Sequence, residues 1–126
     1  MPLELRLEGL PPSKKNSLIS IVNKSTGRPM VFPSSDYKKW EKAAAAFLRL
    51  QANSAKITGT VPPCTVDIIY QITNKRKWDL SNKTESVMDA LVVAGILEDD
   101  NRMCVQDLRM RWFDSVQDGV KISLTY

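Results

Sequence analysis

The sequence of 126 residues contains no histidine. This absence excludes catalysis by Ser–His or Cys–His pairs, zinc sites of the HExxH type, and nucleases that use a histidine base. Any enzymatic chemistry must therefore come from carboxylates, lysines, hydroxyls or a bound cofactor.

Cysteine is scarce, and long apolar runs are absent. Cys64 and Cys104 lie far apart without CxxC spacing, which disfavours a structural zinc site. We expect buried free thiols, with a disulfide as the less expected alternative. No apolar run is long enough to span a membrane, and the N-terminus resembles a strand rather than a signal peptide, so we expect a cytoplasmic protein.

The net charge of +4 is distributed unevenly. Residues 78–102 contain six acids and two bases, so this segment carries −4 and the rest of the chain +8. An acidic island in a basic field fits a protein that binds a polyanion with one surface and a divalent metal at another spot. Uneven surface charge is also common, so composition alone does not decide the function.

The pattern of apolar residues predicts one α+β domain over residues 1–126. Strands are expected over residues 3–7, 17–22, 28–32, 64–72, 103–113 and 120–125, and helices over residues 36–51 and 82–94. This order, ββ(β)αβαββ, predicts a mainly antiparallel or mixed sheet with two helices packed on it.

The residues with the most chemical information lie between Asp79 and Asp100. Asp79 precedes the second predicted helix, and Asp99 and Asp100 follow it. Thirteen helical residues span roughly 20 Å. Acids at the two ends can therefore share a metal ion only if the chain after Gly95 runs back along the helix, which is a nearly taut path.

Carboxylates in this arrangement would suit Mg²⁺. This ion prefers hard oxygen ligands, takes one or two protein carboxylates, and leaves its other positions to water and phosphate. It can polarise a scissile phosphate and activate water without any histidine. We expect Asp79 and Asp100 to be the main ligands, assisted by Asp99 and Glu85, with Mn²⁺ as a possible substitute.

These residues resemble the signature of RusA-type Holliday junction resolvases. The matching strings are Asp79-Leu80-Ser81-Asn82, Asp89-Ala90-Leu91, Ala94-Gly95 and Asp99-Asp100, preceded by Pro11-Pro12-Ser13 with Asn16. The resemblance covers most of the chain. It implies a homodimer without a nucleotide cofactor that resolves four-way DNA junctions by paired, Mg²⁺-dependent nicks in recombination and repair, and that phages or prophages often encode.

Two positions depart from the family pattern. Ser81 stands where the family has a second Asp, and Glu85 where it has a lysine. Residues i and i+4 share a helix face, so Glu85 could supply the missing carboxylate. Lys75 and Lys77 are better substitutes for the lysine than Lys83, and we expect Lys77 to join the catalytic acids. The alternative is an inactive or weak homologue that binds junctions without cleaving them.

Several residues have two possible roles. Asp79 could simply cap the second helix, and Asp89 could be an ion-pair partner rather than a ligand. Asn82 is expected to be the N-cap, with Glu85 completing a capping box. The expected DNA contacts are Lys14, Lys15, Asn16, Lys75, Arg76, Lys77 and Asn82. The lysine-rich runs could instead be solvated charge, and an unrelated α+β protein that binds another anion is a third possibility.

Overall fold

The computed structural model describes residues 2–14, 18–22, 24–74 and 79–126. Its elements in chain order are β1 (Leu3–Glu8), β2 (Leu18–Val22), β3 (Pro29–Pro33), α1 (Ser35–Ser54), β4 (Cys64–Ile72), α2 (Leu80–Val93), β5 (Val105–Asp114) and β6 (Gly119–Thr125). This order and the α+β class confirm the prediction from the sequence.

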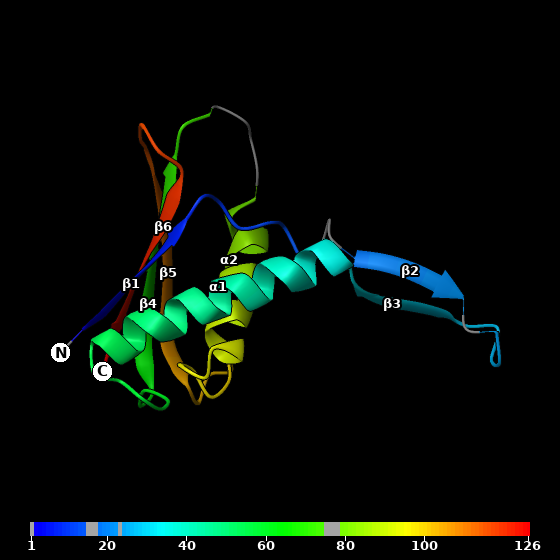
Figure 1. The fold of residues 1–126 in the computed structure, drawn as a ribbon, viewed down its shortest axis with the longest axis horizontal. Helices are drawn as coiled ribbons and strands as arrows, with labels where there is room; N and C mark the ends of the chain where they lie inside the picture. The colour runs from blue at the N-terminus through cyan, green and yellow to red at the C-terminus, as the bar shows by residue number, and fades with distance from the viewer. Residues whose placement is uncertain (1, 15–17, 23, 75–78) are drawn as a thin grey trace.

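Four strands form one mixed sheet in the order β1-β6-β4-β5. Strand β6 is antiparallel to both of its neighbours, whereas β4 and β5 are parallel. The parallel pair is possible because α2 lies between β4 and β5 in the chain and provides the crossover. Strands β2 and β3 form a separate antiparallel hairpin, which projects away from the rest of the molecule beyond the start of α1 (Figure 1).

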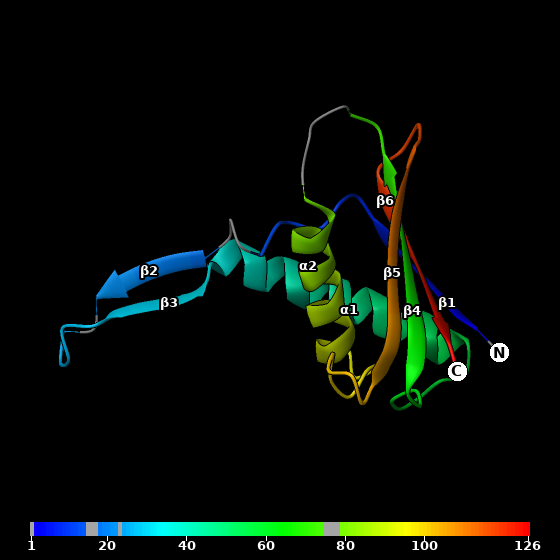
Figure 2. The same ribbon diagram turned by 180° about the vertical axis from the view of Figure 1, so that it is seen from behind.

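Both helices lie on the same side of the sheet, as the front and back views show (Figures 1 and 2). The core combines alternate residues of the central strands with one stripe from each helix, including Val66, Ile68, Ile122, Leu48, Val87 and Leu91, all fully buried. Each such side chain contributes about 1.5–3 kcal/mol through removal of apolar surface from water. This core fixes where α2 lies on the sheet.

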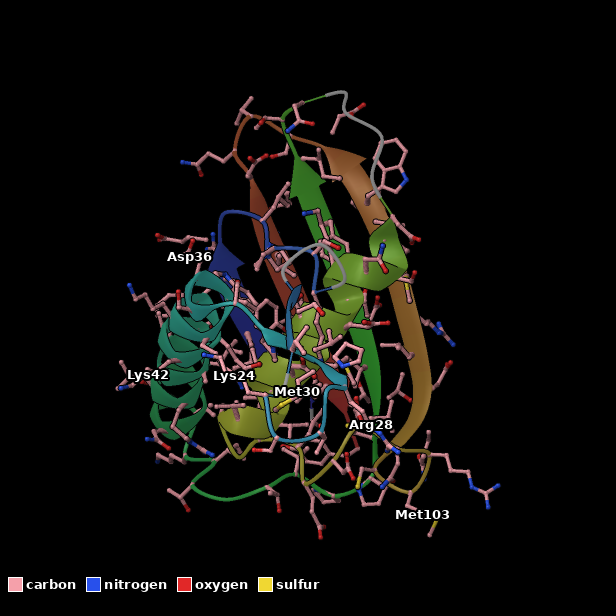
Figure 3. All side chains as sticks on the ribbon, turned by 90° about the vertical axis from the view of Figure 1, so that its right-hand side faces the viewer. Lys24, Arg28, Met30, Asp36, Lys42 and Met103 are labelled. Atoms are coloured by element: carbon pink, nitrogen blue, oxygen red, sulfur yellow. The ribbon has the colours of Figure 1, made fainter. Side chains whose placement is uncertain are left out.

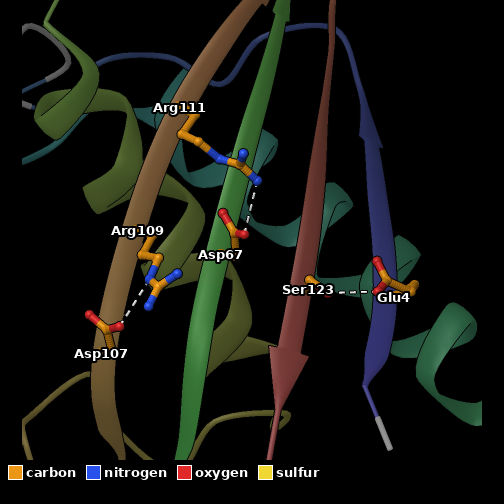
Figure 4. A network of polar contacts seen from close by, with 6 residues as sticks. All are labelled: Glu4, Asp67, Asp107, Arg109, Arg111 and Ser123. Carbon is orange, nitrogen blue, oxygen red and sulfur yellow. Dashed lines mark hydrogen bonds and ion pairs between the residues drawn. The ribbon is translucent and has the colours of Figure 1, made fainter.

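The other face of the sheet is polar. Arg111 pairs with Asp67 at 3.1 Å across the β4–β5 pair, and Ser123 donates to Glu4 at 2.6 Å across the β1–β6 pair (Figure 4). Exposed pairs of this kind contribute about 0–1 kcal/mol each. The face therefore has the character of the solvated side of a half-buried sheet.

The start of α2 differs from the prediction. Asp79, not Asn82, is the N-cap: its Oδ1 accepts hydrogen bonds from the Ser81 backbone N at 2.9 Å and from Ser81 Oγ at 2.6 Å. A carboxylate next to a serine satisfies the first amides, so the helix begins two residues earlier than predicted. The predicted capping box between Asn82 and Glu85 is therefore wrong.

Two other expectations concern the cysteines and membranes. Both cysteines are free thiols; Cys64 is buried and Cys104 is half-buried. Burial raises the pKa of the Cys64 thiol, and the nearby Cys104 adds to the effect. Within the described ranges, neither helix is long and apolar enough to span a membrane.

Candidate functional site

The two ends of α2 are about 21 Å apart, given its 14 residues. Asp79 caps the first end, whereas Asp99 and Asp100 follow the other. At that end Gly95 adopts a positive φ of 72°, which lets its neighbour Ile96 donate back to the carbonyl of Leu91 at 3.1 Å. The chain then passes through a turn at this end of α2 to the start of β5 (Figure 2).

Asp100 shares a pocket with Asp89 in the second half of α2, whereas Asp79 caps the start of the helix. Ile96 and Leu97 are buried in the core, and the amide of Val61 donates to the carbonyl of Ile96 at 2.9 Å. These contacts fix the path of the chain after α2, along which Asp99 and Asp100 line one pocket with Asp89, Val92 and Val93 of the helix. Among the residues described here, no group of three or more His, Cys, Asp or Glu side chains could hold a metal ion. The ligand roles of Asp79 and Asp100 stay predictions, and so does their approach within one chain.

At the first end of α2, the Asp79 carboxylate is exposed and is held by Ser81. The positive end of the helix dipole stabilises this negative charge. Ser81, at the position of the family's second acid, thus orients Asp79 through a short hydrogen bond. The capping role weighed from the sequence is present, and it leaves the side chain on the surface, where a ligand can reach it.

The middle of α2 carries a buried polar network. Asp89 Oδ2 accepts from the Tyr37 hydroxyl at 2.8 Å and pairs with Lys14 Nζ at 2.9 Å. The pKa of Lys14 is raised, chiefly by its hydrogen bond to Asp89 and further by the charges of Asp89, Glu85 and Glu41. The pKa of Tyr37 is raised mainly by burial. Of its two possible roles, Asp89 has that of an ion-pair partner here.

A second set of contacts fixes the segment before Lys14 on α2. Lys83 Nζ donates to the carbonyl of Pro11 at 2.8 Å, and Ser86 Oγ donates to the carbonyl of Pro12 at 2.6 Å. Burial lowers the pKa of Lys83. The Pro-Pro segment of the motif is thus docked on the same helix as the acids, and it determines where Lys14 lies.

Beyond the second end of α2, the carboxylates of Asp99 and Asp100 are neighbours and repel each other. The Asp100 amide donates to Asp99 Oδ1 at 2.7 Å, which holds the Asp99 carboxylate beside the backbone of its neighbour. The pKa of Asp100 is raised by partial burial, by a hydrogen bond with the Asp99 carboxyl and by its charge, with a smaller effect from Asp89. Negative charge at this spot is therefore only partly compensated.

These acids line a pocket of about 260 Å³ between α1, α2 and the turn that follows α2. Its wall contains Lys14, Pro33, Tyr37, Lys38, Glu41, Asp89, Val92, Val93, Asp99 and Asp100. Four carboxylates and two lysines line this small volume, and one of the carboxylates, Asp89, is already paired with Lys14.

The remaining predicted residues have different outcomes. Glu85 is exposed one helical turn beyond Ser81, and Asn82 is half-buried in the first turn of α2. Lys15, Asn16, Lys75, Arg76 and Lys77 lie outside the described residues. Their predicted contacts with DNA, like the roles of Asn82 and Glu85, stay predictions.

Sequence reasoning missed two side chains at the site. Tyr37 is 1 % exposed, and Glu41 is 9 % exposed although it is charged. A buried tyrosine needs a partner for its hydroxyl, and a buried acid on a helix face needs compensation. The spacing of Tyr37 and Glu41, four residues apart on one face of α1, was the signal that could have placed both beside α2.

Comparisons with known proteins agree with the motif. The family model of the endodeoxyribonuclease RusA matches residues 9–125, which include every element of the site. A crossover junction endodeoxyribonuclease RusA from Aquifex aeolicus (strain VF5) is 32 % identical over 102 residues, covering 79 % of this chain and 72 % of the relative. The resemblance expected from the sequence is confirmed. The chain belongs to the RusA endodeoxyribonuclease family.

Proposed function

We propose that this protein is a metal-dependent endonuclease that resolves four-way DNA junctions. The observation that carries the proposal is that the RusA family model covers both ends of α2, where Asp79 and Asp100 are exposed at the motif positions. The relative from Aquifex aeolicus is named for crossover junctions, which supports the choice of substrate.

The donor set fits a divalent cation such as Mg²⁺. The exposed carboxylates of Asp79, Asp99, Asp100 and Glu85 are hard oxygen donors. The pKa of Asp100 is raised first by burial and then by Asp99, and a cation would relieve the second of these effects. When bound, the ion would polarise a scissile phosphate and activate water, and Mn²⁺ would be expected to substitute. Lys77 would neutralise charge on the same phosphate.

In one chain, α2 with a length of about 21 Å lies between the Asp79 cap and the turn that carries Asp100, so we propose that a site using both acids takes them from two copies. A two-fold arrangement in which the α2 helices of two copies lie antiparallel would bring the first end of each to the second end of the other. The homodimer would then have two identical sites, which suits paired nicks in a symmetric junction.

One observation favours a second candidate function, junction binding without cleavage. Ser81 has no carboxylate, and its hydroxyl donates at 2.6 Å to the same Asp79 oxygen that accepts the Ser81 amide. A site with one acid fewer binds a cation more weakly. In this candidate Glu85 does not replace the missing acid.

The deciding experiment uses a labelled four-way junction and a matching linear duplex, each with Mg²⁺, Mn²⁺ or EDTA. Symmetric nicking of the junction alone, lost in EDTA and in Asp79→Asn, supports the nuclease. Tight binding without nicking in either metal supports the binding module. Ser81→Asp, with Ser81→Ala as its control, then measures the effect of the missing acid: nicking should rise only in the former.

A further inference from the structure

We propose that the β2–β3 hairpin, residues 18–33, is an arm that enters a groove of the DNA with Lys24 and Arg28 at its tip. This inference rests on the proposed function and adds a contact surface beyond the motif residues. It follows from the shape of the hairpin, its charge and its exposed side chains.

The arm is structurally separate from the sheet and the helices. Its two strands hydrogen-bond to each other, with Val22 opposite Pro29 and Ser20 opposite Val31, and they form a sheet of their own. Both overall views show it extending beyond the start of α1 (Figures 1 and 2). Residues 24–31 are all exposed, so the tip presents its side chains on every side.

The arm lies in the segment that carries the whole net charge of the chain. Residues 9–35 contain four bases and no acid, and the rest of the sequence contains 14 bases and 14 acids. Two of these four bases, Lys24 and Arg28, lie at the tip (Figure 3). A projecting segment with only positive charge is attracted to a polyanion and releases counterions when it binds one.

The dimensions of the arm suit a DNA groove. Five residues in each strand extend for about 17 Å. A two-stranded ribbon of this kind fits the major groove of B-DNA, which is roughly 12 Å wide. The turn between Lys24 and Arg28 contains Gly27 at φ 70° and the exposed residues Ser25 and Thr26. Their small polar side chains can contact phosphates.

The chemistry of the arm favours DNA over another protein strand. Pro29 and Pro33 lack the amide hydrogen that a paired strand would use, so β3 is a poor template for sheet extension. The exposed apolar residues Val22 (65 %), Met30 (44 %) and Val31 (62 %) lie beside the basic tip. Such side chains contact thymine methyl groups or partly unstacked bases in DNA complexes.

The test measures binding of a fluorescent four-way junction by anisotropy, in EDTA and over a series of KCl concentrations. The double variant Lys24→Ala/Arg28→Ala should weaken binding by about tenfold or more, and the slope of log K against log salt should fall by about 1.8, from two lost phosphate contacts. The control is Lys39→Ala/Lys42→Ala, which removes the same charge from exposed positions on α1.

Each outcome has a distinct meaning. A loss in the arm variant alone supports the arm as a DNA contact, whereas equal losses in both variants, or none in the arm variant, overturn it. If the wild-type protein does not bind the junction, the proposed function itself fails. The apolar double variant Val22→Ser/Val31→Ser tests whether the arm contacts a second copy of the chain instead of DNA. If light scattering shows that this variant converts a dimer to a monomer, and the basic variant binds the junction as the wild type does, the proposal is overturned.

Discussion

The two ends of α2 hold their acids in opposite electrostatic settings. Asp79 caps the first end, where the helix dipole is positive and Ser81 donates two hydrogen bonds to it. Asp99 and Asp100 follow the second end, where the dipole is negative and the two carboxylates oppose each other. Asp79 and Asp99 therefore accept hydrogen bonds from their neighbours, whereas the pKa of Asp100 is raised by burial and by Asp99.

We infer from this difference that Asp100, beyond the second end of α2, is kept for function at a cost in stability. A carboxylate that caps a helix has a structural reason to be present whether or not the protein binds a metal. Asp99 also has a structural reason, since its carboxylate accepts from the Asp100 amide and from Asn101 Nδ2. The pKa of Asp100 is raised, first by burial and then by Asp99, at a place where a cation is proposed to bind. The following predictions test this contrast, beginning with the largest effect.

Removing one carboxylate charge at either end of α2 should strongly reduce nicking without unfolding the protein. Asp79→Asn and Asp100→Asn are each expected to lower the rate of junction nicking by about 100-fold or more, because each removes a proposed metal ligand. Asparagine still caps a helix, so Asp79→Asn should remain folded by circular dichroism. Full activity in either variant would contradict the site.

The matched control is Asp36→Asn, an exposed acid in the first turn of α1 (Figure 3). This variant removes the same charge at another helix start, outside the pocket lining. It should nick junctions at the wild-type rate. A comparable loss in Asp36→Asn would mean that net charge, not the site, controls the rate.

The network between the two ends should matter most for stability. Asp89→Ala is expected to lower the free energy of unfolding by about 1–3 kcal/mol, because the buried Tyr37 hydroxyl and the Lys14 ammonium lose their shared partner. Urea denaturation measures this. Asp107→Ala, which removes a surface partner of Arg109, should change stability by less than about 0.5 kcal/mol. Equal effects would refute a structural role for Asp89.

Removing the acid should lower the free energy of unfolding at the first end of α2, where it caps the helix, but not at the second end. Asp79→Ala is expected to lower the free energy of unfolding by about 1 kcal/mol, and Asp79→Asn by much less, because asparagine also accepts from the first amides. Asp100→Ala should not destabilise the protein. The same urea curves test this, and an unaffected Asp79→Ala would show that Ser81 alone can begin the helix.

The smallest expected effect is a gain in stability at the second end. The pKa of Asp100 is raised in the folded protein from its ordinary value of 3.8, so the folded chain binds this proton more tightly than the unfolded chain. Stability from this group is therefore lost as pH rises through that window. Asp100→Asn should match the wild type at pH 3 and be slightly more stable at pH 7, a small gain because solvent screens this exposed carboxylate.

Thermal melting at the two pH values is the measurement for Asp100→Asn. Asp118→Asn is not a suitable control, because Asp118 accepts two hydrogen bonds from Thr73. Asp36→Asn serves better, since its carboxylate is exposed. A difference between Asp100→Asn and the wild type that is the same at both pH values would contradict the electrostatic explanation.

The sequence predicted the fold well where side-chain periodicity decides the structure. In β4, Val66, Ile68 and Tyr70 share one face of the strand, and all three are buried. The start of α2 was missed because two capping residues, Asp79 and Asn82, lie one helical turn apart. Periodicity cannot choose between them, and the hydroxyl of Ser81 favours the first.

The candidate site was predicted in its residues but not in its arrangement. Asp79, Asp89 and Asp100 were identified along the chain, yet their relation in space depends on the path after Gly95. That path is fixed by burial of Ile96 and Leu97 in the core, which is a tertiary effect. The Lys14–Asp89 pair joins residues 75 positions apart, and no local pattern signals it.

Mixing two inactive variants tests the proposed active site, in which Asp79 of one chain meets Asp100 of another. Asp79→Asn and Asp100→Asn proteins are unfolded together, refolded, and assayed for nicking of a four-way junction. In a mixed dimer one site carries both substitutions and the other carries neither. Random pairing should therefore restore about a quarter of the wild-type sites, seen as single nicks rather than paired ones. If the mixture stays as inactive as each variant alone, the two acids do not act across the dimer and the account is wrong.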